Sequence, residues 1–373
     1  MNVPFLDLKR QFSNVRHMAE MHDAIFDVMV SGRYILGPVV EAFEKELAEY
    51  CNVKHAVGVA SGTDALELAL RAAPRMAEDW QQIRVPAFTF GATLSAVIAA
   101  GLRPILRDVD EVTFTIAKSV SEHCADMLVN GEGVGPIMGP TLPVHLYGQL
   151  AEPSKAQRIV IEDMAQGIGL PVTGDAACLS FFPTKNLGCM GDGGAVLTND
   201  DEIAEKVRML RAHGCKTKYH HEIVGTNSRL DAIQAAILRV NLKHLDGWIA
   251  RRREIAERYT DGLKDVQGII CPVAVREHVW NQYTVRFPWE KSDIGFSMRD
   301  EVKTTLKGAG IDTMVYYPLP LHLQPAFAHL GYKEGDFPNA EQACHEVLSL
   351  HCNPYLTDEE QTYVIETLKD VMG

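Results

Sequence analysis

Lys185 lies in a segment of apolar and small residues, Ser-Phe-Phe-Pro-Thr-Lys-Asn-Leu-Gly from Ser180 to Gly188, and a glycine-rich run follows at Gly191. A lysine held away from water loses part of the stabilisation of its ammonium form, so its pKa falls and its free amine can condense with an aldehyde. Lys185 is therefore a candidate Schiff-base lysine. The alternative is a buried stem whose amine reaches the surface, which for an isolated lysine is the more common arrangement.

A carboxylate is expected to face the same region. The residues from Arg158 to Glu162 are Arg-Ile-Val-Ile-Glu, a short β-branched run that is typical of a buried parallel strand, and Asp163 follows directly. Ligands of open α/β sheets bind at the carboxyl ends of the strands. We therefore expect Asp163 to point toward the same site as Lys185.

A third segment has the features of an anion-binding helix start. A strand-like run from Val57 leads into the turn Ser61-Gly-Thr-Asp64, after which leucines and alanines recur at helical spacing as far as Leu70. Small residues at the start of a helix leave backbone N–H groups free, and the helix dipole favours a phosphate there. An ordinary N-cap without any ligand is the alternative.

Together, an amine, a carboxylate and a phosphate site are the three contacts that a pyridoxal phosphate enzyme needs. The lysine holds the aldehyde, the carboxylate keeps the pyridine nitrogen protonated so that the ring accepts electrons, and the helix start holds the phosphate. The three segments therefore point to pyridoxal 5'-phosphate as the cofactor.

At this point the chain resembles the DegT/DnrJ/StrS sugar aminotransferases, which share the aspartate aminotransferase fold, fold type I. The resemblance covers nearly the whole chain. It is carried, besides the lysine segment, by the motifs at Phe5–Lys9, Gly32–Pro38, Ser61–Leu66, Pro86–Thr93, Pro143–Gln149, Glu162–Gln166, Gly225–Asp231 and Tyr317–His322. It implies an α/β fold with a large domain at residues 1–245, whose mostly parallel seven-stranded sheet is flanked by helices, and a smaller C-terminal α+β domain at residues 246–373.

The resemblance also implies roles for single residues around the cofactor. Lys185 would form the internal aldimine, Asp163 would pair with the pyridine nitrogen, and Gln166 would contact the ring hydroxyl. Phe90 would stack on the ring face, although core packing is the more common fate of an aromatic beside a strand. Asn227 would reach the phosphate from the neighbouring subunit of a homodimer, or else would only turn the chain before the next helix. The phosphate contacts implied within one chain are Gly62, Thr63 and Ser180.

The implied reaction moves an amino group from glutamate to a keto-sugar linked to a nucleoside diphosphate, with pyridoxamine 5'-phosphate as the intermediate form. Some similar proteins carry histidine at the lysine position and dehydrate sugars, so Lys185 favours transamination. Amination at C3 is slightly favoured over C4. Arg229 could bind a carboxylate or phosphate bidentately, or could form a structural ion pair with Asp231 or another acid. The residues expected around the sugar nucleotide are Arg229, His220, His221, Tyr316, Tyr317 and His322.

Composition argues against several other classes of protein. A net charge of −13 argues against a nucleic-acid binder, because phosphate backbones require a basic surface. No apolar run approaches the ~18 residues of a membrane span, and the N-terminus lacks the pattern of a secretion signal. The eight cysteines have no metal-ligand spacing, so we expect no metal site and a reduced, cytoplasmic protein.

Strand-like runs alternate with helical patterns as far as about residue 245, as in a mostly parallel sheet covered on both faces. The strands expected there are residues 56–60, 83–86, 104–108, 141–145, 159–162, 179–182 and 195–198. Beyond them we expect a polar helix at 248–264, a strand at 283–287 and a helix at 299–308. The connections at 149–159 and 169–175 are shorter than is usual in the family.

Two other functions stay open at this point. One is an aminotransferase that acts on a keto-cyclitol or another keto-sugar. The other is a non-catalytic regulatory or scaffold protein, against which the retention of Lys185, Asp163 and Gln166 argues. The pathway also stays open, whether O-antigen or other polysaccharide biosynthesis or the assembly of an antibiotic sugar.

Overall fold

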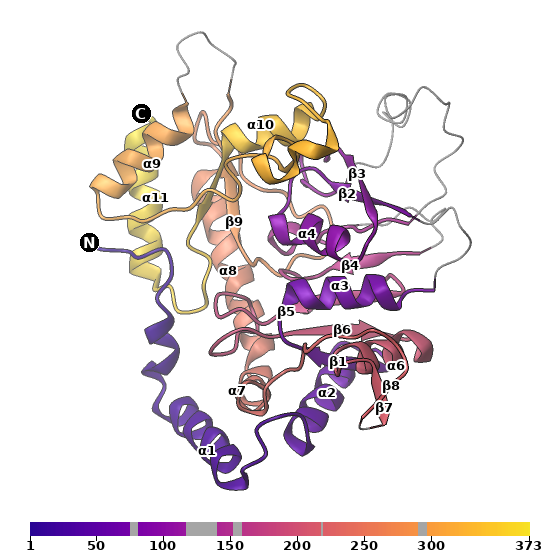
Figure 1. Ribbon diagram of the computed structural model, residues 1–373. Coiled ribbons are helices and arrows are strands. Elements are labelled where there is room, and N and C mark those ends of the chain that lie inside the picture. Colours follow the sequence, from indigo (N-terminus) through magenta and orange to yellow (C-terminus); the bar gives the residue numbers. More distant parts are fainter. Residues whose placement is uncertain (75–80, 117–139, 152–158, 218, 290–296) are drawn as a thin grey trace.

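The computed structural model describes residues 1–74, 81–116, 140–151, 159–217, 219–289 and 297–373 (Figure 1). Most of the short connection expected at 149–159 lies outside these residues. The second one, at 169–175, packs closely on the strand before it, because a Cβ on Gly174 would lie 2.6 Å from the Val160 carbonyl oxygen. Residues 169–175 therefore join two parallel strands without a crossover helix.

The centre of the molecule is a mostly parallel sheet, as predicted. Isolated parallel bridges at Thr141 and Val144 place residues 141–144 between β4 and β2. β6 is antiparallel to both of its neighbours, whereas the other pairs are parallel. Across the described residues the strand order is β1 (His55–Val59), β6 (Gly194–Thr198), β5 (Ala176–Ser180), β4 (Ile161–Asp163), residues 141–144, β2 (Gln82–Pro86) and β3 (Arg103–Arg107).

The strands begin or end within one or two residues of the expected bounds, except at two places. Residues 141–145 form single bridges rather than a continuous strand. β5 begins at Ala176 and ends at Ser180, instead of running from 179 to 182. Pro183 cannot donate to a ladder, and the chain turns there to bring Lys185 back toward Phe182, whose carbonyl accepts from the Lys185 N–H at 2.9 Å.

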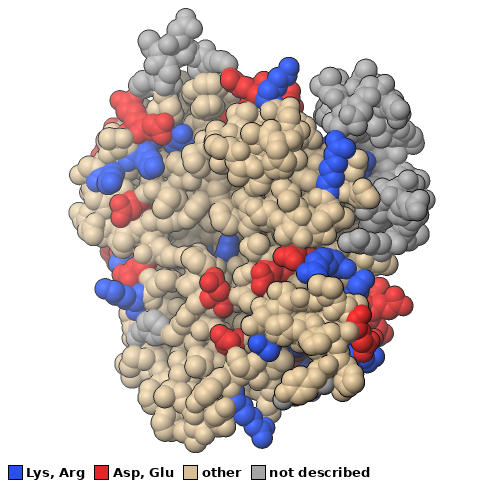
Figure 2. Space-filling view, in the orientation of Figure 1, with Lys and Arg blue, Asp and Glu red and all other residues tan. Residues whose placement is uncertain are grey.

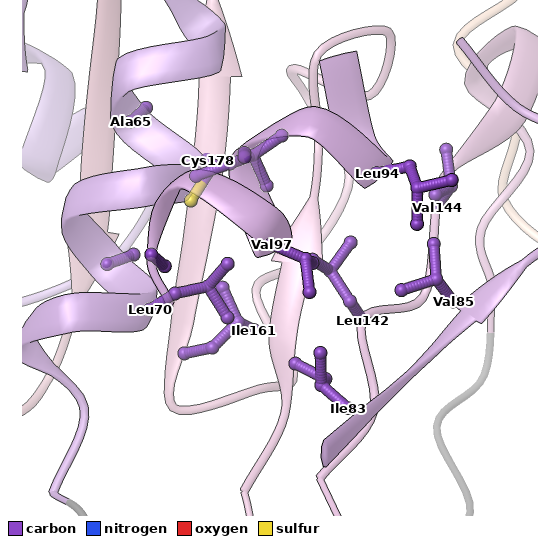
Figure 3. Close-up of a cluster of buried hydrophobic side chains, with 14 of the residues drawn as sticks. Ala65, Leu70, Ile83, Val85, Leu94, Val97, Leu142, Val144, Ile161 and Cys178 are labelled. Carbon is purple, nitrogen blue, oxygen red and sulfur yellow. The ribbon is translucent and has the colours of Figure 1, made fainter. Parts of the chain in front are cut away.

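Alternate residues of the strands face two separate layers of helices. Val57, Cys178 and Val196 belong to the core under α3 (Gly62–Ala72), α4 (Gly91–Ala99) and α6 (Asp201–Leu210). Figure 3 shows Leu70 of α3 and Leu94 and Val97 of α4 beside strand residues of this cluster. Their sequence neighbours on the strands face the core formed with α2 (Pro38–Tyr50) and α7 (Ala232–Leu242). The period of two therefore places a helical layer on each face of the sheet.

Most of the chain after residue 245 forms a third core. Its elements surround a two-stranded antiparallel sheet, in which Tyr283 pairs with Leu350. Val3 also joins this core through a bridge to Ile311. The elements are α8 (Leu245–Leu263), β9 (Tyr283–Arg286), α9 (Met298–Gly308), β10 (Val347–Leu350) and α11 (Asp358–Met372). The buried residues of α10 (Pro338–Glu346) pack instead in the core under α3 and α4.

Two smaller elements complete the fold. α1 (Val15–Ser31) packs along α7 and projects at the lower left of Figure 1. β7 (Cys215–Thr217) and β8 (His220–His221) form an exposed hairpin. None of the helices in the described residues is both long enough and apolar enough to cross a membrane. On the face drawn in Figure 2, acidic and basic side chains are interspersed.

Candidate active site

The Lys185 amine and the Asp163 carboxylate lie close together at the carboxyl ends of β4 and β5. Asp163 is the last residue of β4, and its register partner on β5 is Cys178, two residues before Ser180. Burial lowers the pKa of Lys185, and the nearby Asp163 charge opposes that shift. The free amine is therefore available at lower pH than for an ordinary lysine.

Asp163 is buried and is oriented by two hydrogen bonds. Oγ1 of Thr93, in the first turn of α4, donates to Oδ2 at 2.7 Å, and the Ala165 N–H donates to Oδ1 at 3.1 Å. Burial raises the pKa of the carboxyl, while these two donors and the Lys185 charge hold it down. In addition to these two donors, a buried carboxylate of this kind can bind a further proton donor.

Gln166 is oriented by the backbone of the Pro143–Gln149 motif. Its Oε1 accepts from the N–H of Tyr147, which lies in the 3-10 turn η2 (Leu146–Gly148) with a left-handed φ of 60°. Because the amide oxygen is used in this way, the amide Nε2 of Gln166 is left to donate to another group. Tyr317 lies near this amide: burial raises the pKa of its hydroxyl, and Gln166 opposes that shift.

The start of α3 forms a close-fitting turn over β5 and β6. Ser61 caps the helix by accepting from the Asp64 N–H at 3.1 Å, so the amides of Gly62 and Thr63 are left without a helical partner. A Cβ on Gly62 would lie 2.6 Å from Cβ of Ser180, and one on Gly194 would lie 2.3 Å from the Ser61 carbonyl oxygen. The two glycines therefore let the helix start approach the ends of the strands.

Phe90 is 60% exposed and occupies the N-cap position of α4. Its ring stacks on Tyr317 with centroids 5.9 Å apart and an interplanar angle of 30°. The ring is therefore not part of the core, and it remains available to a ligand. Tyr316 precedes Tyr317, and its carbonyl accepts a hydrogen bond from the hydroxyl of Tyr147.

Asn227 and Arg229, which were expected at the phosphate and the substrate, differ in their exposure. Asn227 is exposed, and its neighbour Ser228 binds the Ala60 N–H at 3.2 Å, so the segment lies against the turn before α3. Arg229 is half-buried, and its Nε has no hydrogen-bond partner among the described residues. It makes no ion pair with Asp231 there, contrary to the structural alternative.

The expected substrate histidines are divided between the surface and the core. His220 and His221 are exposed on β8, where Nδ1 of His221 lies 2.8 Å from the His213 carbonyl. His322 is 2% exposed, and its Nε2 lies 2.8 Å from Oε1 of Glu341. The Nδ1 of this buried ring has no hydrogen-bond partner among the described residues, and the role of His322 at the substrate stays a prediction.

Sequence reasoning missed three residues that shape the site. Thr93, Tyr147 and Asn186 all lie in motifs that carry the family resemblance, yet none of them was assigned a contact. A polar residue on the buried side of an otherwise apolar helix, as Thr93 is on α4, was an available signal. The donor from Tyr147 is a backbone N–H, for which residue type gives no signal.

These residues fit pyridoxal phosphate. The observations that carry the fit are the free amides at Gly62 and Thr63, the close approach that Gly194 permits, and the buried Asp163 with its raised pKa. A phosphate suits the amides, and a protonated pyridine nitrogen suits the carboxylate. The described residues contain no group of His, Cys, Asp and Glu suited to a metal ion, and all described cysteines are free.

The sequence matches one protein-family model, the DegT/DnrJ/EryC1/StrS aminotransferase family, over residues 16–369. A "Pleiotropic regulatory protein" of Geobacillus stearothermophilus is 45% identical over 99% of this chain and 98% of its own length. The dTDP-3-amino-3,4,6-trideoxy-alpha-D-glucose transaminase of Streptomyces venezuelae is 42% identical over 99% of this chain and 96% of its own.

Solved structures show the same similarity. The crystal structure of S. venezuelae DesV in complex with a ketimine intermediate superposes with a TM-score of 0.86 at 41% identity, over 100% of this chain and 98% of DesV. The crystal structure of NtdA from Bacillus subtilis, with bound cofactor PMP, gives a TM-score of 0.87 at 32% identity, over 100% of this chain and 85% of NtdA.

Proposed function

Because this chain belongs to the DegT/DnrJ/EryC1/StrS aminotransferase family, whose members include pyridoxal-phosphate-dependent sugar aminotransferases like this one, we propose that it aminates a keto-sugar linked to a nucleoside diphosphate. Glutamate is the proposed amino donor. The single observation that carries this proposal is the half-buried Lys185, whose pKa is lowered, beside the buried Asp163 carboxylate and the free amides that start α3.

The names of the relatives support a nucleotide-linked substrate aminated at C3. Besides the dTDP-sugar transaminase, a 37% identical relative from Pseudomonas aeruginosa is a UDP-2-acetamido-2-deoxy-3-oxo-D-glucuronate aminotransferase. A 32% identical relative from Bacillus subtilis, a 3-oxo-glucose-6-phosphate:glutamate aminotransferase, has no nucleotide in its substrate name. It supports the alternative of another keto-sugar, and it also supports glutamate as donor and C3 as the position.

The proposed roles follow from the protonation states of the two charged groups. Bound pyridoxal phosphate would supply an electron sink for the carbon that bears the amino group. Lys185, whose pKa is lowered by burial, would take up a proton from that carbon as a neutral amine and return it. Asp163, oriented by Thr93, would hold a proton on the pyridine nitrogen, and Nε2 of Gln166, whose Oε1 accepts from the Tyr147 N–H, would donate to the ring hydroxyl.

The phosphate and the ring face use the remaining residues. We propose that the amides of Gly62 and Thr63, with Oγ of Ser180, hold the phosphate, and that Phe90 covers the ring. Arg229 is proposed for the diphosphate or a carboxylate of the sugar, because its Nε has no partner among the described residues. Tyr316, Tyr317 and the exposed histidines of β8 are proposed around the sugar.

We also propose a homodimer in which Asn227 reaches the phosphate of the neighbouring subunit. Tyr34 and Ile35 lie beside this segment, since Ile35 bridges Asp231. They continue an exposed apolar surface on α1, and such surfaces mark interaction sites. The exposed apolar residues of this surface are Phe26, Met29, Val30, Tyr34 and Ile35.

We also propose that the chain is divided into two domains, at residues 1–245 and 246–373.

A single-turnover assay tests the function. The protein is converted to its pyridoxamine phosphate form with glutamate, nucleotide-linked 3-keto and 4-keto sugars are added, and recovery of the visible absorbance is followed. We expect recovery with a 3-keto sugar and none with the Lys185→Ala variant. Recovery only with sugars that carry no nucleotide would favour the alternative substrate.

The name of the 45% identical relative gives a second candidate, a regulatory protein. The same assay separates the two functions, because a regulator without catalysis needs neither a reactive lysine nor conversion by glutamate. A cofactor-loaded protein that glutamate leaves unchanged would contradict the proposed donor and favour the regulatory function.

A further inference from the structure

Asn186, directly after Lys185 in the chain, is buried and has no part in the roles proposed above. Its side chain is 4% exposed, its Nδ2 donates to the Val279 carbonyl at 2.9 Å, and its Oδ1 accepts from Nδ2 of Asn281 at 3.0 Å. Both ends of the amide are thus bound by one turn that lies 93 to 95 residues further along the chain.

The same turn also holds the loop that orients Gln166. The Val279 N–H donates to the Gly148 carbonyl at 2.9 Å, and the Gln282 N–H donates to the Tyr147 carbonyl at 3.2 Å. Tyr147 in turn donates its own N–H to Oε1 of Gln166. Residues 279–282, which we name the 279–282 turn, therefore contact the loop of the lysine and the loop of the glutamine together.

Arg252 on α8 fixes this turn from another direction. The side chain is 5% exposed, and its Nη1 donates to the carbonyls of Trp280 at 3.2 Å, Asn281 at 3.3 Å and Cys352. Cys352 follows β10, so the guanidinium joins the turn to the third core of the molecule. The guanidinium binds the turn through Nη1, whereas its buried Nε has no hydrogen-bond partner among the described residues.

We propose that Asn186, Asn281 and Arg252 are positioning residues for Lys185, which hold the lysine loop so that the half-buried lysine stays beside Asp163. This inference rests on the proposed function, in which Lys185 is the reacting amine. Without the amide contacts the loop loosens and more water reaches the amine. Water stabilises the ammonium form, so the pKa of Lys185 then rises toward that of an exposed lysine.

A network that only stabilised the fold would lower the melting temperature without changing the protonation of Lys185. The experiment therefore measures that protonation directly. Full-length protein is reconstituted with pyridoxamine phosphate, in which the lysine amine is not bonded to the cofactor. Pulses of acetic anhydride are given over a range of pH, and acetylation of Lys185 is quantified by mass spectrometry, so that the midpoint of the profile reports the pKa.

Two variants and their combination are compared. Asn186→Ala removes both amide contacts, and Asn281→Ala removes one and leaves the backbone of the turn in place. We expect both to move the midpoint upward, Asn186→Ala more, with acetylation relative to the high-pH plateau falling roughly threefold or more at a pH below the midpoint. The double variant should move it no further than Asn186→Ala, because the two side chains act as one unit.

Gln361→Ala is the matched control, since it also removes a buried amide that donates to a backbone carbonyl, that of Ile255 at 2.7 Å. It should lower the melting temperature and leave the Lys185 midpoint unchanged. Folded Asn186→Ala and Asn281→Ala proteins with the wild-type midpoint would overturn the proposal, and Asn281→Ala alone decides if Asn186→Ala does not fold. The profile needs no sugar substrate, so it is independent of whether the proposed reaction is found.

Discussion

Asp163 is suited to binding the cofactor, but in the protein without cofactor it lowers the stability of the fold. Burial raises the pKa of its carboxyl, so the folded state binds this proton more tightly than the unfolded chain does. The stability that the proton gives is present at low pH and is lost as the pH rises through the raised pKa. At neutral pH the ionised Asp163 therefore costs free energy of folding, which a bound pyridinium offsets.

Asp163→Asn should for this reason separate stability from activity. Without cofactor, we expect the variant to be at least as stable as the wild type near neutral pH, and the difference to shrink in acid, where Asp163 is protonated. Transamination should fall by roughly a hundredfold to a thousandfold, because the stabilising charge at the ring nitrogen is lost. Thermal unfolding at two pH values and the glutamate half-reaction measure these effects. A cofactor-free variant that is clearly less stable at neutral pH would contradict this account of Asp163.

Thr93 opposes the effect of burial on the pKa of Asp163 through its 2.7 Å hydrogen bond to the carboxylate. Thr93→Val removes that donor with little change of volume, so the pKa of Asp163 should rise further. As the pH is lowered, Asp163 is then protonated earlier, and cofactor affinity should begin to fall at a higher pH than in the wild type. A hydrogen bond to a charged group predicts roughly a tenfold loss of affinity. Thr89→Val is the control, because Thr89 Oγ1 contacts only Oγ1 of Thr93, at 3.1 Å. Equal losses in the two variants would argue against a direct role of Thr93.

At the scale of elements, the start of α3 has to lie close to β6. Gly194→Ala would place a Cβ 2.3 Å from the Ser61 carbonyl oxygen, which is backbone and cannot rotate away. The start of α3 must then shift, and a displacement of about 1 Å at the phosphate site predicts a loss of activity on the order of a hundredfold. Gly308→Ala in α9 meets nothing within 4 Å and should change neither activity nor cofactor affinity. Equilibrium titration with pyridoxal phosphate compares the cofactor affinity of the two variants. Unchanged affinity in Gly194→Ala would show that the close approach of the start of α3 to β6 is not required.

The elements also show how much the sequence could predict. The mostly parallel sheet and the positions of Lys185 and Asp163 were predictable, because apolar strand patterns and residues at strand ends are properties of the chain itself. The pairing of residues 141–144 through single bridges was not, since it depends on neighbours distant in sequence. The burial of His322 beside Glu341 was not predictable either, because a motif gives the order of residues and not the side to which each points. The 279–282 turn was missed because most of its contacts use backbone groups.

At the scale of the whole molecule, the position of Asn227 permits two different sites. Its neighbour Ser228 contacts the turn before α3 of the same chain, so Asn227 lies near that chain's own phosphate site. Asn227 is also exposed, four residues before Asp231, which bridges Ile35 of the exposed apolar surface where a second subunit is proposed to pack. The two possibilities differ in which subunit completes each active site.

Mixed dimers distinguish them. Lys185→Ala and Asn227→Ala proteins, each of low activity alone, are unfolded together in equal amounts and refolded. If Asn227 acts across the interface, each mixed dimer has one site with both native residues, and about a quarter of the wild-type activity should return. If it acts within its own chain, every site in the mixture keeps one defect and no activity returns. The control mixes Lys185→Ala with Asp163→Asn, whose native residues interact within one chain, so this pair should never complement. Recovery of activity in the mixture that contains Asn227→Ala, and none in the mixture that contains Asp163→Asn, would therefore assign the phosphate contact to the neighbouring subunit. The dimer would then be a requirement for catalysis.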